Sequence, residues 1–137
     1  MANQHPAKPT ESELEILQVL WANGPCAVRT VNDQLNLQRE VGYTTTLKIM
    51  QLMLNKGLVA RDTSSRTHIY RAAVSEKETR ANLLDRFVDT TFRGSAMDMV
   101  MQALGNKDTS AEELAEIKAF IKKIEAEECF EAVSIDY

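Results

Sequence analysis

The sequence has few of the residues that build metal centres, disulfide scaffolds or covalent catalytic sites. Its 137 residues include only two cysteines, Cys26 and Cys129, and two histidines, His5 and His68. None of them lies in a CxxC pair or a His/Cys cluster, so we expect reduced cysteines, no metal site and no Cys–His nucleophile. A disulfide scaffold is excluded for the same reason.

Long apolar runs and phosphate-binding loops are also missing. No stretch approaches the roughly 20 apolar residues of a membrane-spanning helix. Residues 1–10 are polar and lack the apolar core of a secretory signal, so we expect a cytoplasmic protein. The five glycines are scattered, and no acid, base and nucleophile converge. We therefore expect no enzyme, no catalytic residues and no cofactor.

Charge is distributed unevenly along the chain. The net charge of −4 argues by itself against nucleic acid. Residues 26–74, however, hold seven Lys or Arg against three Asp or Glu, a balance of +4. Residues 75–137 hold eight against fourteen, a balance of −6. A basic segment beside an acidic one leaves nucleic acid open as a partner.

The first half has the element order of a winged helix-turn-helix, namely three helices followed by a hairpin. A capping box begins the first helix, and Gly57 suits the end of the third. Two short runs rich in β-forming residues around a polar turn predict the hairpin. The first expected helix runs from a capping box at residues 10–13 to Asn23-Gly24, the second over residues 28–37 and the third from near Thr44 to Gly57. The two strands are expected over residues 58–61 and 67–72.

The second half is expected to form three more amphipathic helices, of which the first and the last begin with capping boxes at residues 75–78 and 110–113. They are too small to build a good core alone, so we expect their apolar faces to pack against a second copy, giving a homodimer. Packing back onto the first half is the alternative. Residues 129–137 alternate apolar and polar side chains and form either a tail or an added strand. The residues expected to dimerise are Leu84, Phe87, Met99, Val100, Leu114, Ile117, Ile121 and Ile124.

Several segments resemble the penicillinase repressor (BlaI/MecI/CopY) family, from about residue 9 to residue 127. The resemblance implies a homodimeric bacterial repressor whose N-terminal winged helix reads the major groove of a palindromic operator. It also implies that the C-terminal helices dimerise. The matching segments are TESELEIL at residues 10–17, GYTTTLK at 42–48, NKGLV at 55–59, HIYRA at 68–72 and SAEEL at 110–114.

Two departures from the family pattern concern the release signal. Copper-responsive members carry closely spaced C-terminal cysteines, whereas Cys129 stands alone, so copper sensing is not expected. In β-lactam-responsive members a sensor protease cuts an Asn-Phe bond in the short dimerisation helix. The matching pair here is Gln102-Ala103. A regulatory protease is still one candidate partner. Whether proteolysis or a ligand releases the DNA stays open, because the pair differs from the family's cleavage site.

Candidate DNA contacts lie at the start of the third helix and in the hairpin. Lys48 can donate to guanine, Gln51 can pair with adenine, and Leu47 can touch a thymine methyl group. Arg66 at the hairpin tip is expected to contact phosphate or enter the minor groove. The candidates are Arg29, Tyr43, Thr44, Thr45, Leu47, Lys48, Gln51, Arg61 and Arg66.

Structural roles remain open for some of these residues. Thr44 can act only as a helix cap, Tyr43 can lie partly in the core, and Arg29 can be only a solvated charge. Leu52 is expected to pack on a neighbouring helix. On the same third helix, Thr46, Ile49, Met50 and Met53 recur at helical spacing, so their face is expected to be buried.

These patterns predict a mainly α fold with a small β-hairpin. A winged helix-turn-helix DNA-binding domain is expected over residues 9–74 and a helical dimerisation region over 75–128, with tails at 1–8 and 129–137. The predicted function is a sequence-specific repressor that binds a palindromic operator as a homodimer and occludes a promoter. The alternative is a winged-helix protein-binding adaptor without specific DNA binding.

Overall fold

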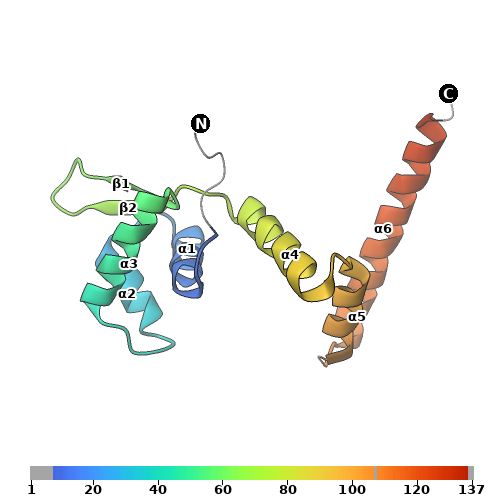
Figure 1. The fold of residues 1–137 in the computed structure, drawn as a ribbon, viewed down its shortest axis with the longest axis horizontal. Coiled ribbons are helices and arrows are strands. Elements are labelled where there is room, and N and C mark those ends of the chain that lie inside the picture. Colours follow the sequence, from blue (N-terminus) through green and yellow to red (C-terminus); the bar gives the residue numbers. More distant parts are fainter. Residues whose placement is uncertain (1–7, 107, 136–137) are drawn as a thin grey trace. The chain divides into compact units, whose positions relative to one another are not determined.

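The computed structural model describes residues 8–106 and 108–135, with side chains up to residue 128. Contacts divide the chain into two compact units, one reaching to Phe87 and one beginning at Val88. The element order confirms the expected mainly helical winged fold (Figure 1). In the described residues the elements are α1 (Glu11–Asn23), α2 (Val28–Leu35), α3 (Tyr43–Lys56), β1 (Val59–Asp62), β2 (Ile69–Ala72), α4 (Glu76–Phe92), α5 (Ala96–Asn106) and α6 (Ala111–Ile135).

The core of the first unit lies between α1, α2, α3 and the hairpin. α1 begins with the expected capping box, in which the Thr10 hydroxyl accepts the Glu13 N–H at 3.2 Å and the Glu13 carboxylate accepts the Thr10 N–H at 2.9 Å. This box satisfies two amides that the helix itself leaves without partners. The buried apolar residues are Ile16, Leu17, Leu20, Val28, Val31, Leu35, Val41, Met50, Met53, Leu58, Val59 and Tyr70.

The two helices of the helix-turn-helix differ slightly from the predicted bounds. α2 ends at Leu35, two residues earlier than predicted, because Asn36 caps it and its side chain bonds to the following turn. α3 begins at Tyr43 with Gly42 as its N-cap, so the reading of Thr44 as the cap is wrong. Its end is as predicted, with Gly57 in the left-handed conformation at φ 82°.

The hairpin is attached to the helices by a contact that the sequence did not predict. β1 and β2 pair antiparallel, with Val59 opposite Ala72 and Asp62 opposite Ile69. Beyond this ladder, Cys26 and Tyr70 form an antiparallel bridge through N–H···O bonds of 3.0 and 2.9 Å. The segment before α2 is therefore hydrogen-bonded to β2, on the edge that β1 leaves free, which fixes the wing against the helices.

Each C-terminal helix begins after a serine cap. The hydroxyls of Ser75, Ser95 and Ser110 accept backbone N–H groups three residues ahead at 3.0, 3.1 and 3.1 Å. The caps at Ser75 and Ser110 agree with the predicted boxes, and the Ser95 cap was not predicted. α6 continues to Ile135, so the added strand considered for residues 129–137 is wrong, and residues 129–135 extend the last helix instead.

Among the described residues, no helix combines the length and hydrophobicity that a bilayer crossing requires. His, Cys, Asp and Glu side chains in this part of the chain form no group of three able to hold a metal ion. Cys26 is a half-buried free thiol, and burial raises its pKa. His5 and the side chain of Cys129 lie outside the described residues.

Candidate nucleic-acid interface

The outer face of α3 carries a row of polar side chains. Thr44, Thr45, Lys48 and Gln51 are all exposed, as the helical spacing predicted. The opposite face packs into the core through Thr46, Met50 and Met53. A helix buried on one face and polar on the other can enter the major groove, whose base edges offer both donors and acceptors.

The N-terminus of α3 is suited to an anion. Gly42 has no side chain, and no side-chain hydrogen bond caps the helix. The first-turn amides therefore lack the partner that a Ser, Thr or Asp cap would supply. Together with the helix dipole, such amides favour a phosphate oxygen at this end.

A groove of about 630 Å³ lies where the starts of α2 and α3 meet the hairpin. It brings together four of the predicted DNA contacts from three separate elements. Arg29 comes from α2, Tyr43 and Leu47 from α3, and Arg66 from the hairpin tip. Leu47 also packs partly against the core, which explains its intermediate exposure. The full lining is Ala27, Val28, Arg29, Thr30, Asp33, Tyr43, Leu47, Arg66, Thr67, His68 and Tyr70.

Arg29 and Tyr43 contact each other within this groove. The guanidinium carbon of Arg29 lies 5.2 Å from the centre of the Tyr43 ring, a cation–π arrangement. Arg29 is thus more than a solvated charge. Tyr43 is 41% exposed, so the reading that placed it partly in the core is wrong. The pair presents one fixed positive charge beside the first turn of α3.

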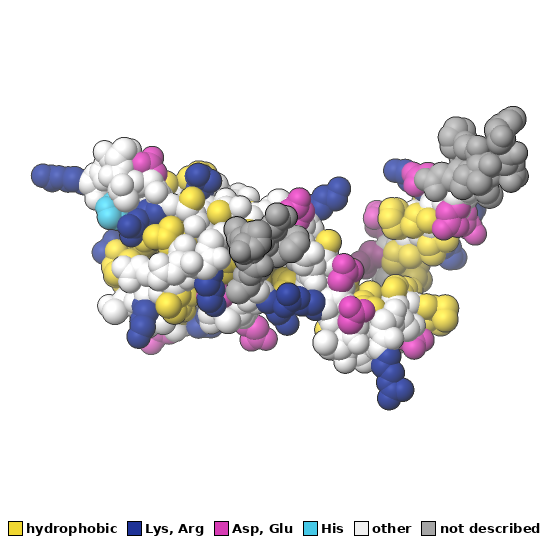
Figure 2. All heavy atoms as spheres, turned by 45° about the horizontal axis from the view of Figure 1, so that its top comes forward, with side chains coloured by type: hydrophobic (Ala, Val, Ile, Leu, Met, Phe, Trp, Pro, Cys, Tyr) yellow, Lys and Arg dark blue, Asp and Glu magenta, His cyan; other side chains and the backbone are white. Residues whose placement is uncertain are grey.

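The wing turn is held by its own hydrogen bonds. The Asp62 carboxylate accepts the Ser64 N–H at 2.9 Å, and the Ser65 hydroxyl donates to the Thr67 carbonyl at 2.7 Å. The hydrogen bonds from Ser64, with a smaller contribution from the Arg71 charge, hold the pKa of Asp62 below its ordinary value. Arg66 is exposed within this ordered turn. Basic side chains surround the first unit on the face shown in Figure 2.

The groove does not gather every predicted contact. Thr44, Thr45, Lys48 and Gln51 lie on the outer face of α3, and Arg61 lies on β1, all outside the groove lining. Sequence reasoning missed four polar lining residues. Thr67 and His68 lie in the predicted hairpin, and Asp33 lies one helical turn after Arg29, so these three positions carried a usable signal. The missed residues are Thr30, Asp33, Thr67 and His68.

The C-terminal helices expose a large apolar surface within the single chain. Leu84, Phe87 and Ile121 each leave about half of the side chain exposed, at 48, 48 and 50%. Met99 and Ile117 are partly buried, and Gln102 and Ala103 are exposed on α5. Figure 2 shows hydrophobic side chains uncovered on these helices. Leu52 on α3 is 48% exposed as well, so the expectation that it packs on a neighbouring helix is wrong. The other exposed large apolar residues of α4, α5 and α6 are Met97, Val100, Met101, Leu114, Phe120 and Ile124.

Comparison with known proteins finds that this chain is similar to a family of regulatory proteins. The family model described as "Penicillinase repressor" matches residues 9–123. The methicillin resistance regulatory protein MecI of Staphylococcus epidermidis is 17% identical over 114 residues, covering 83% of this chain and 93% of the relative. The transcriptional regulator BlaI of Mycobacterium tuberculosis is 28% identical, covering 78% of this chain and 83% of the relative.

A solved structure supports the fold. The transcriptional regulator Tm0710 of Thermotoga maritima matches with a TM-score of 0.50 and 16% identity. The match covers 89% of this chain and 79% of that protein. At this low sequence identity, the match supports the fold alone.

Proposed function

Because the chain belongs to the penicillinase repressor family of DNA-binding transcriptional regulators, we propose that it binds a palindromic operator as a homodimer and represses by occluding a promoter. Repression of this kind needs no catalytic step. The observation that carries the proposal is the convergence of Arg29, Tyr43 and Arg66 beside the exposed polar face of α3. A regulator of this kind acts where the chromosome lies, so the proposal places it in the bacterial cytoplasm.

In this proposal α3 enters the major groove and the wing contacts the backbone. Lys48 donates to guanine, Gln51 pairs with an adenine edge, and the threonines at the helix start contact thymine or phosphate. Arg29 and the first-turn amides of α3 bind phosphate beside the groove. Arg66, carried by the ordered wing turn, binds phosphate or reaches the minor groove, with Arg61 nearby on β1.

The exposed apolar residues of α4, α5 and α6 support the dimer. Each of these helices leaves large apolar side chains exposed in the single chain, and burying them in a twofold interface removes them from solvent. Leu114, Ile117, Ile121 and Ile124 recur at 3-4-3 spacing, which suits a coiled-coil-like seam. Twofold symmetry then makes two half-sites spaced by about one helical turn, or a multiple of it, a geometric consequence.

The proposal divides the chain by role. Residues 9–74 bind DNA, and residues 75–128 join the two copies. Dimer formation sets operator occupancy, because a monomer holds only one half-site. A protease or ligand that loosens the C-terminal helices would release the DNA without touching α3.

Fluorescence anisotropy tests the proposal directly. The full-length protein is titrated against DNA from upstream of its own gene and against an unrelated duplex, over a salt series. We expect selective binding that weakens with salt, because phosphate contacts release counterions, and footprinting should show a protected palindrome. Equal binding to both duplexes, or none, would contradict the operator on this DNA and favour the protein-binding adaptor.

A further inference from the structure

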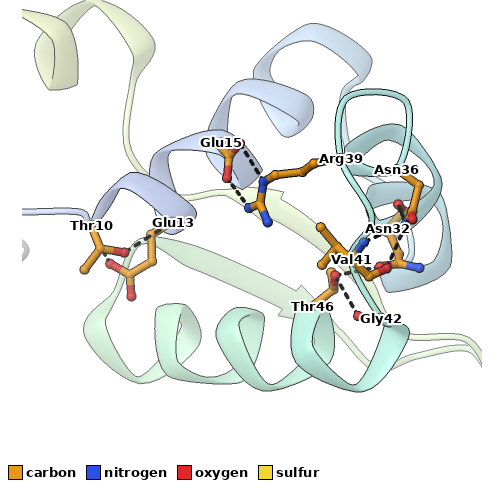
Figure 3. Close-up of polar contacts among 9 residues, drawn as sticks. All are labelled: Thr10, Glu13, Glu15, Asn32, Asn36, Arg39, Val41, Gly42 and Thr46. Carbon is orange, nitrogen blue, oxygen red and sulfur yellow. Dashed lines mark hydrogen bonds and ion pairs between the residues drawn. The ribbon is translucent and has the colours of Figure 1, made fainter.

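A polar cluster joins α2 to the first turn of α3 (Figure 3). It lies on the buried side of α3, away from the exposed residues that are proposed to contact DNA. The Thr46 hydroxyl lies 2.7 Å from the side-chain amide of Asn32 on α2 and 3.3 Å from the Gly42 carbonyl. Asn36, at the end of α2, spans the turn, since its amide nitrogen donates to the Val41 carbonyl at 2.8 Å and its oxygen accepts the Val41 N–H at 3.1 Å. We call these five residues the Asn32 cluster.

The Asn32 amide completes the cluster when its nitrogen faces the turn. In that orientation the nitrogen lies 3.1 Å from the Val41 carbonyl and 3.2 Å from the Gly42 carbonyl, with the Thr46 oxygen at 2.7 Å. The hydrogen-bond network favours this assignment, because every neighbour of the nitrogen is then an acceptor. One side chain of α2 therefore contacts both the turn and the first helical turn of α3.

Because Thr46 is buried, its hydrogen bonds constrain the orientation of α3 relative to α2. Thr46 is fully buried, in contrast to its exposed neighbour Thr45. A hydroxyl left without a partner in such a place is costly, so the folded state keeps Thr46 facing Asn32. Apolar neighbours such as Met50 tolerate sliding and rotation far better than a 2.7 Å hydrogen bond does, because dispersion contacts have little directionality.

The same turn of α3 carries the outward residues. Thr44, Thr45 and Lys48 lie within two residues of Thr46, on the exposed part of the helix surface. Any rotation or axial shift of α3 that breaks the contact with Asn32 moves these side chains relative to a bound duplex. Phosphate contacts made by Arg29 and the wing would be affected less, since they come from other elements.

We propose that Asn32 and Thr46 are positioning residues, which set the depth and rotation at which α3 reads bases. This inference rests on the proposed function of α3 as the recognition helix. Its consequence is a selective loss. Breaking the Asn32 cluster should reduce discrimination between operator and unrelated DNA while leaving the phosphate contacts of Arg29 and Arg66, which lie outside α3, unchanged.

The test compares two variants at one buried site. Thr46→Val removes the hydroxyl at nearly constant volume, and Thr46→Ser keeps it. We expect Thr46→Val to lower the ratio of operator to unrelated-duplex affinity roughly tenfold, comparable to one mismatched base pair. The salt slope should stay at the wild-type value, because it counts the phosphates neutralised by Lys and Arg, and the arginines assigned to phosphate lie outside α3. Thr46→Ser should restore most of the ratio.

If Thr46→Val does not fold, Asn32→Ala tests the same contact from its other, half-buried partner. Its matched control is Asn23→Ala, because the Asn23 side chain also donates to a helix carbonyl, that of Val19 at 2.9 Å, but within α1. We expect only Asn32→Ala to lower the affinity ratio. Circular dichroism and thermal melting of each variant report whether the fold is retained.

Three results would overturn the inference. Variants that melt earlier but keep the wild-type affinity ratio would give the cluster a purely structural role. Equal losses in Thr46→Val and Thr46→Ser would show that the hydroxyl is not the cause. Wild-type protein without operator preference would remove the proposed function and this inference together, and that result is read before any variant is made.

Discussion

The Lys56 ammonium nitrogen lies 2.8 Å from a carboxylate oxygen of Glu13, joining the end of α3 to the start of α1. The Glu13 side chain is only 4% exposed, and it also accepts the Thr10 N–H of the capping box. Burial alone raises the pKa of Glu13, but the hydrogen bonds from Lys56 and Thr10 and the Lys56 charge more than offset burial. The pKa of Glu13 is therefore lowered.

We expect Glu13→Gln to lower the free energy of unfolding by about 1–3 kcal/mol, because it breaks a charged pair in which one partner is buried. Glutamine keeps an oxygen for the capping box, so the change isolates the contact with Lys56. Urea unfolding at neutral pH measures the loss. The control is Glu15→Gln, which removes a more exposed pair with Arg39 and should cost less. Equal losses in the two variants would contradict the prediction.

Acid should remove this contribution. Because the folded-state pKa of Glu13 lies below its ordinary value of 4.5, the ionised carboxylate stabilises the fold above that value. The stabilisation is lost as the pH falls from 4.5 through the lower folded-state pKa. Unfolding free energies measured across this range should therefore converge for the wild type and Glu13→Gln as the solution becomes more acidic. A constant difference between them would show that Glu13 does not titrate in this way.

Local signals predicted most of the helix ends. The capping boxes at Thr10 and Ser110 and the left-handed Gly57 depend on neighbours within a few residues, so the sequence contains them in full. The Cys26–Tyr70 bridge joins residues far apart in the chain, and no periodicity reports it. The continuation of α6 to Ile135 was missed because an alternating pattern also occurs on a helix surface.

For the candidate site, too, local features were predictable from the sequence and contacts between distant segments were not. Helical spacing was sufficient to predict that Lys48 and Gln51 are exposed, because residues opposite the buried face of a helix face the solvent. The groove was not predictable, since it forms only when Asp33 and His68 come together from separate elements. Thr46 did carry a signal, being the one polar residue on the predicted apolar face of its helix. That signal named a position but not its partner, Asn32.

Lys48→Ala should weaken operator binding by roughly 1–3 kcal/mol, the cost of losing a good base contact. Unrelated DNA should be bound nearly as before, because the exposed Lys48 side chain is assigned to a base rather than to phosphate. Anisotropy titrations on both duplexes measure the two affinities. Lys77→Ala, which removes an exposed lysine on α4, is the control for the change in net charge. Equal weakening on both duplexes would place Lys48 on phosphate instead.

Arg66→Ala should flatten the salt dependence by about one unit of slope, because one phosphate contact is lost. The reduction should appear on operator and unrelated DNA alike, since phosphate carries no sequence. Affinities measured from low to moderate salt give the slope. Arg80→Ala removes an arginine paired with Glu76 on α4 and should leave the slope unchanged. A loss confined to the operator would make Arg66 a base reader in the minor groove.

Ile121→Asp should convert the proposed dimer to monomers and weaken operator binding as a result. Ile121 is 50% exposed in the single chain, so a carboxylate there remains hydrated in the monomer but is buried without a partner in the proposed interface. Met99→Glu on α5 should act similarly. Sedimentation velocity measures the oligomeric state, and circular dichroism checks that the helices remain. Ala119→Asp introduces the same charge on the far side of α6, about 200° around the helix from Ile121, and should leave the dimer intact. Dimers that persist in Ile121→Asp or Met99→Glu would place the interface elsewhere.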